Sequence, residues 1–139
     1  MIQIAPELLK ALREIDFGIP GVDVRDAYYI SDPTLPMLTF DELPGNDGVY
    51  LDNQPSIVTN VFTVEAYAGQ MIVKDRAMTG KEIAYILLDA ADKLLNNQFG
   101  LTMNGNITAA PYQDQRVFRA VARYTAYIDT RNGTILRSI

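Results

Sequence analysis

The stretch SIVTNVFTVEAYAG, residues 56–69, decides the fold because it is the clearest strand in the chain. Apolar side chains occupy both sets of alternate positions: Val58, Phe62 and Val64 in one set, and Ile57, Val61 and Tyr67 in the other. A half-buried strand normally has one apolar face and one solvated face. We therefore expect the first set to pack on helices of the same chain and the second set to contact something else.

The composition is that of an ordinary globular domain. The chain has 139 residues, of which 48% are hydrophobic and 21% charged, and a chain of this size can bury roughly two-thirds of its unfolded surface. We expect a single domain over residues 1–139. No apolar run approaches the roughly 18 residues of a membrane span, so no membrane partner is expected.

The residue types needed for common catalytic chemistry are missing. The chain contains no histidine and no cysteine, which removes thiol nucleophiles, serine–histidine relays and most zinc or copper sites. It also contains no glycine-rich phosphate-binding motif. We therefore expect no enzymatic activity, no cofactor and no metal site.

Two further amphipathic elements accompany the long strand. Residues 79–82, TGKE, form a capping box that predicts the start of a helix, whose apolar face is expected at Ile83, Ile86, Leu87, Ala90 and Leu94. Residues 116–129 alternate almost as regularly as residues 56–69 and predict a second long strand.

The remaining elements are shorter. We expect a helix over residues 6–15, strands over 22–30, 35–40 and 101–110, and a final short strand near the C-terminus. Residues 41–55 are rich in glycine, proline, asparagine and aspartate, which is typical of a long loop or an open hairpin. The fold class predicted is α+β, with a mainly antiparallel sheet of about four to five strands and two helices packed on one face.

Charge is distributed unevenly between the two halves of the chain. The net charge is −5, with −7 in residues 1–60 and +2 in residues 61–139. Arg119 and Arg123 form a basic strip on one face of the second long strand. Two interpretations stay open, namely a contact with phosphates or acidic neighbours and a solvated sheet face.

Several segments together resemble the tail terminator proteins of long-tailed bacteriophages, also described as tail completion, head–tail joining or minor capsid proteins. The likeness runs through PMLTFDELPG, YLDNQPS, NVFTVEAYAG, the capped helix and FGLTMNGNITAAPYQDQRVFRAVARYTAYID, over residues 35–129. The resemblance implies a structural virion protein that forms a ring, hexameric in this family. Such a ring caps the tail tube, ends its elongation and joins the tail to the head connector.

The resemblance also implies partners and a location. They are further copies of the chain, the tail-tube protein, the head–tail connector and DNA passing through the lumen, in the tail-neck region of a virion assembled in the host bacterial cytoplasm. The expected subunit or tail-tube interface comprises Ile57, Val61, Tyr67, Arg119 and Arg123. The expected connector-docking loop carries Asp41, Glu42, Asp47 and Asp52.

Two other functions are compatible with the residues alone. One is a small ligand- or regulator-binding module that uses the acidic segment 41–55 as its site. The other is a hydrolase that relies on two carboxylates roughly 5–10 Å apart in a cleft. Formation of a ring would favour the virion protein over both.

Overall fold

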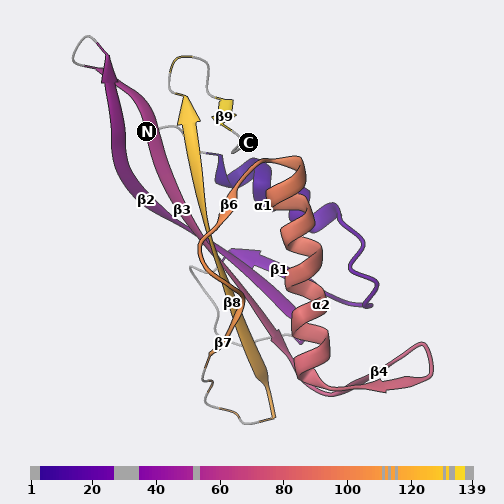
Figure 1. The fold of residues 1–139 in the computed structure, drawn as a ribbon. Helices are drawn as coiled ribbons and strands as arrows, with labels where there is room; N and C mark the ends of the chain where they lie inside the picture. The colour runs from indigo at the N-terminus through magenta and orange to yellow at the C-terminus, as the bar shows by residue number, and fades with distance from the viewer. Residues whose placement is uncertain are drawn as a thin grey trace.

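A computed structural model describes residues 4–26, 35–51, 54–110, 112, 114, 116–129, 131 and 134–136, and the side chains among them except those of 44–51 and 54–56. The part of the chain so described holds two α-helices and a mostly antiparallel seven-stranded sheet (Figure 1). The elements in order are α1 (Ala5–Glu14), β1 (Asp23–Asp26), β2 (Met37–Leu51), β3 (Gln54–Ala68), β4 (Met71–Val73), β5 (Arg76–Met78), α2 (Gly80–Asp92), the π-helical segment η1 (Lys93–Gln98), β6 (Thr102–Met103), β7 (Thr108–Ala110), β8 (Phe118–Asp129) and β9 (Thr134–Leu136). The predicted α+β class is confirmed.

The sheet has more strands than the four to five predicted, because one of its edges is built from three short pieces. Its order is β1-β2-β3-β8, and β9, β6 and β7 pair in turn with successive parts of β8 along its other side. The single strand expected over residues 101–110 is interrupted between β6 and β7, where Gly105 adopts a left-handed backbone with φ +76°. Only the β1–β2 pair is parallel; the other pairs are antiparallel.

Of the two forms expected for residues 41–55, a long loop or an open hairpin, the structure has the hairpin, as the distal part of the paired strands β2 and β3. β2 runs to Leu51 and β3 begins at Gln54, and the two strands pair along their length with register shifts between Pro44 and Tyr50. β1 pairs with β2 only over residues 37–40, so the rest of β2 is an edge strand, where proline and bulges are tolerated. The strand expected over 22–30 is observed as β1, and residues 27–30 lie outside the described residues.

The core lies between one face of the sheet and the two helices. Phe62 and Val64 of β3 and Tyr124 of β8 are fully buried there, in one cluster with Leu8 and Leu12 of α1. The predicted side of β3 that packs on helices is therefore confirmed. We call this the inner face of the sheet, and its opposite side the outer face.

Helix α2 begins where the capping box predicts, but it packs through a slightly different stripe. The Glu82 N–H donates to the Thr79 hydroxyl at 3.2 Å. The buried positions are Ile83, Ala84, Leu87, Leu88 and Ala91. Ile86 was expected to be buried and is instead 36% exposed, which places an isoleucine on the outer surface of the helix layer.

Candidate functional site

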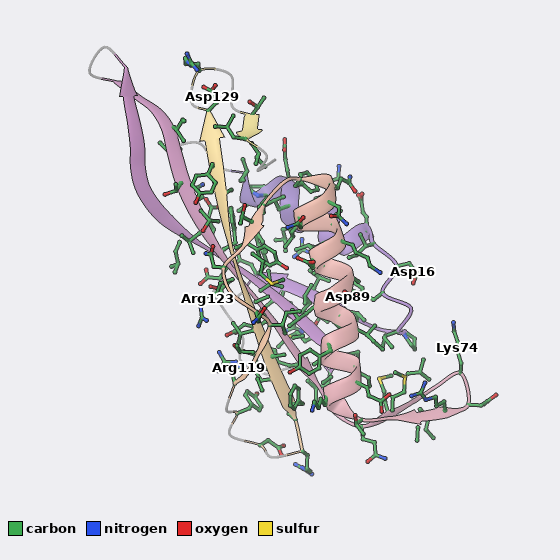
Figure 2. The ribbon with its side chains drawn as sticks, in the orientation of Figure 1. Asp16, Lys74, Asp89, Arg119, Arg123 and Asp129 are labelled. Atoms are coloured by element: carbon green, nitrogen blue, oxygen red, sulfur yellow. The ribbon has the colours of Figure 1, made fainter. Side chains whose placement is uncertain are left out.

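The outer face of the sheet is the surface that the sequence predicted to contact a partner. Neither α1 nor α2 covers it, and Figure 2 shows Arg119 and Arg123 on the side of the sheet away from α2. The register places every second residue of β2, β3 and β8 on this face. It thus brings together all five predicted interface residues: Ile57, Val61, Tyr67, Arg119 and Arg123.

One half of the outer face is closed within the chain. Met37 and Thr39 of β2 and Val121 of β8 are buried, and so is Tyr67 of β3. The ring of Tyr112 lies against the ring of Tyr67 in an edge-on arrangement, with centroids 5.3 Å apart. A partner therefore finds little open surface at this end of the sheet.

Arg119, Glu65 and Tyr67 interact with one another in this closed half. The Arg119 guanidinium forms an ion pair with the Glu65 carboxylate, and the Tyr67 hydroxyl donates to the same carboxylate at 2.7 Å. The Arg119 guanidinium also lies 5.8 Å from the centre of the Tyr67 ring. Burial, followed by the hydrogen bond to Glu65, raises the pKa of Tyr67 to about 12. These internal contacts argue against the expected interface roles of Tyr67 and Arg119.

The other half of the outer face exposes apolar side chains. Leu43, Tyr127 and Leu136 are 52%, 43% and 38% exposed, and Val61 is half-buried among them. Leu43 lies opposite Val61, Tyr127 lies opposite Leu136, and Val61 and Tyr127 are diagonal neighbours on adjacent strands. We call Leu43, Val61, Tyr127 and Leu136 the open patch. Ile57, half-buried at the end of the same face, borders it.

Sequence reasoning found only part of the open patch. The alternation of β3 predicts Val61, whereas Leu43 lies in a segment without alternation, so its place opposite Val61 follows only from the pairing of β2 with β3. Tyr127 was also missed, although it occupies the same alternate positions of β8 as Arg119 and Arg123.

Arg123 is the exposed cation beside the open patch. It lies opposite Thr63, and Asp41 of β2 lies opposite Thr63 on the other side. Among the described side chains, the Arg123 guanidinium has no carboxylate within ion-pair distance, unlike Arg116, Arg119 and Arg131. It remains available to bind an acidic group of a partner.

The acidic residues predicted to dock the connector lie in different environments. Asp41 lies half-buried on the outer face, whereas Glu42 points to the inner face, accepts a hydrogen bond from Asn60 Nδ2 at 2.7 Å and interacts with the backbone N–H of Ala5 at the start of α1. Burial raises the pKa of Glu42, and the two hydrogen bonds oppose that rise. Glu42 thus connects β2 to β3 and to the start of α1. The side chain of Asp47 and the whole of Asp52 lie outside what the structure describes.

The helix side of the molecule has its own depression. A groove of about 540 Å³ lies between residues 15–18, which follow α1, and the exposed side of α2 and η1. A second hollow of about 360 Å³ adjoins the start of α1 beside Glu42. Within the described ranges, no group of three or more aspartate or glutamate side chains is placed to hold a metal ion.

These features define an α+β protein whose sheet is covered by helices on one face and is partly open on the other. No protein-family model matches the chain, and no curated protein sequence matches it. Neither of the two described α-helices is long and apolar enough to cross a membrane.

Proposed function

We propose that the protein is a structural virion protein that forms a ring on the tail tube of a long-tailed bacteriophage. The ring ends elongation of the tube and joins the tail to the head connector. The observation that carries the proposal is the open patch, a run of apolar side chains on a sheet face that no helix of the described chain covers. The resemblance of the sequence to tail terminator proteins is the reason for proposing a ring on a tail tube rather than another assembly.

The open patch favours association because apolar surface is removed from water when a partner covers it. Each square ångström of apolar surface buried stabilises a complex by roughly 25 cal/mol. Contiguous exposed apolar side chains on a soluble protein mark an interaction surface more often than scattered single residues do. A second copy of the chain is the partner that a ring requires.

The β2–β3 hairpin supplies a second contact element. β2 has 15 residues, a length of roughly 50 Å at about 3.3 Å per residue. β8 pairs with β3 only from Ile57 onward, so the end of the hairpin extends past β8 and the helices, as Figure 1 shows. We call residues 41–55 of this hairpin the hairpin arm, and we assign to it the connector-docking role expected for these residues.

The mechanism is passive and involves no covalent step. The ring occupies the end of the tube, so that further tube subunits find no site, and its other side presents the hairpin arms to the connector. The protein would then act in the tail-neck region of the virion, with DNA passing through the lumen of the ring, after assembly in the host bacterial cytoplasm.

Electron microscopy of the purified protein mixed with tail tubes tests this function. The wild-type protein is expected to form rings at the ends of the tubes, and the variant Val61→Asp is expected to lose them because a carboxylate in the open patch must be desolvated. The variant Ile72→Asp serves as a matched control, because Ile72 is an exposed strand residue of β4 outside the patch. Bare tube ends with the wild-type protein would refute the proposal.

A ligand-binding module is the second candidate, and the groove of about 540 Å³ on the helix side is the observation that favours it. A pocket of this size is within the range that accommodates a small organic ligand. This alternative predicts a protein that stays a monomer or dimer and leaves tail tubes uncapped.

A further inference from the structure

The groove on the helix side combines apolar and acidic side chains. We call the groove-lining residues Ile15, Asp16, Phe17, Ile86, Asp89 and Leu94 the helix groove. Ile86 is the exposed residue of α2 that the sequence placed in the core. Its exposure gives the helix layer an apolar contact point of its own.

The charges around the helix groove leave an excess of one negative charge. Asp89 forms an exposed ion pair with Lys93 at 3.4 Å, so these two charges largely cancel. Asp16 accepts a hydrogen bond from the backbone N–H of Gly18 at 2.8 Å, and among the described side chains no cation forms an ion pair with it. Figure 2 shows Asp16 and Asp89 on the helix side of the molecule and Arg123 on the opposite side.

The outer face of the sheet offers the complementary features. Its open patch is apolar, and the exposed Arg123 beside the patch lacks a carboxylate partner in the described part of the chain. Arg123 is exposed, whereas Asp41 on the same face is half-buried on the far side of Thr63, so the exposed cation can meet the excess anion of the helix groove. Two copies of the outer face, by contrast, would place like surfaces together and leave the helix groove empty.

We propose that the open patch of one copy packs into the helix groove of the next copy, with Arg123 against Asp16 and Asp89. The inference rests on the ring proposed above and names its subunit contact. Because the two surfaces lie on opposite sides of one subunit, the contact is heterologous, and each added copy presents a new free surface until the ring closes. Sheet and helix layers of neighbouring copies then alternate around the ring.

Charge reversal tests the pairing. Arg123→Asp and Asp89→Arg, prepared as separate variants, are each expected to weaken self-association at least about tenfold in sedimentation velocity experiments. A mixture of the two variants is expected to associate again, because the intact groove of the first meets the intact patch of the second. Arg116→Asp, in the turn that precedes β8, is the control and is expected to associate like the wild type.

Failure of the mixture to associate better than either variant alone would overturn the inference. Unchanged association of both single variants would overturn it as well. Far-ultraviolet circular dichroism of each variant verifies that it is folded, and Asp89 is chosen over Asp16 because its side chain is 67% exposed and makes no backbone contact that shapes a turn.

Cross-linking distinguishes the head-to-tail contact from a face-to-face dimer. The chain contains no cysteine, so the variants Ile86→Cys and Tyr127→Cys can be joined selectively with a short bis-maleimide. The double variant is expected to give a ladder of cross-linked species, and each single variant is expected to remain uncross-linked. Dimers from Tyr127→Cys alone, or no ladder from the double variant, would contradict the contact.

The two proposals fail in different ways. Rings on tail tubes without the ladder would leave the function standing and remove the contact. A ladder without rings on tubes would leave the contact standing and remove the tail-capping function.

Discussion

At the residue scale, burial rather than sequence spacing decides what each arginine near β8 does. Arg116 is 90% exposed and pairs with Asp114, two residues away. Arg119 of β8 is 28% exposed and forms an ion pair with Glu65 of the adjacent strand β3. Arg123 is exposed beside the open patch. The alternation of the strand predicts that Arg119 and Arg123 share a face, but it cannot predict which half of that face the chain covers.

Removal of Arg119 should therefore cost much more stability than removal of Arg116. Arg119→Met removes the cation that pairs with the partly buried Glu65 carboxylate, and we expect the free energy of unfolding to fall by about 2–3 kcal/mol. Arg116→Met is the matched control and should leave the stability unchanged, because exposed ion pairs contribute little. Urea denaturation of both variants measures the difference. Equal effects of the two substitutions would contradict the arrangement.

The raised pKa of Tyr67 predicts a loss of stability at alkaline pH. A tyrosine whose folded-state pKa is about 12 holds its proton more tightly when folded than when unfolded, where the pKa is about 10. Its contribution is complete below pH 10 and is lost as the pH rises from about 10 to 12. Denaturant unfolding of the wild type and of Tyr67→Phe over this range should show the smaller decline in the variant. Parallel declines would show that the hydroxyl is not perturbed.

At the element scale, the sequence predicted the long strands and the start of α2 well, because alternation and capping are local signals. The packing stripe of α2 was harder to predict. Residues 83–91 are apolar on nearly every side of the helix, so periodicity alone could not choose between Ile86 and Leu88. Contact with the sheet makes that choice, and it buries Leu88 and exposes Ile86.

In the β2–β3 hairpin, by contrast, local residue types do not predict the structure. Proline and glycine at positions 44, 45 and 48 are typical of a loop. Pairing with β3 nevertheless continues along this segment, because an edge strand accommodates such residues in bulges. The long partner strand, which lies beyond the segment itself, determines the outcome.

The first turn of α2 packs so closely against the end of β3 that only a glycine fits at position 80. A Cβ added at Gly80 would lie 2.4 Å from the backbone oxygen of Ala68, the last residue of β3. Gly80→Ala should therefore push the first turn of α2 away from the sheet and lower the free energy of unfolding by about 2 kcal/mol. The neighbouring Lys81→Ala, which removes an exposed side chain, should change it by less than about 0.5 kcal/mol. Thermal unfolding compares the two variants.

The hairpin arm should be dispensable for folding and necessary for joining. Deletion of residues 46–53 removes the end of β2, including Asp47 and Val49 opposite Val58 and Ile57, but none of the residues of β3 that pair with β8. We therefore expect a folded subunit that still caps tail tubes. Capped tails carrying this variant should fail to join heads, as counted by electron microscopy in an in vitro joining assay. Normal joining would show that the arm is not the docking element.

At the scale of the whole molecule, the sheet has two faces of different character. The sequence predicted that the outer face contacts something beyond the helices. It could not predict that the chain closes half of this face itself, around Tyr67 and Val121, because that closure depends on contacts between distant parts of the chain. What remains open is a smaller and more apolar patch than the sequence indicated, centred on Val61 and Tyr127 rather than on Tyr67 and Arg119.

The central claim is that copies of this chain cover the open patch of one another. Sedimentation equilibrium over a range of concentrations measures this most directly. We predict that the wild-type mass exceeds the 15.5 kDa of one chain and rises with concentration, while Val61→Asp stays at the mass of one chain. A wild-type protein that remains a 15.5 kDa monomer up to its solubility limit would contradict the account.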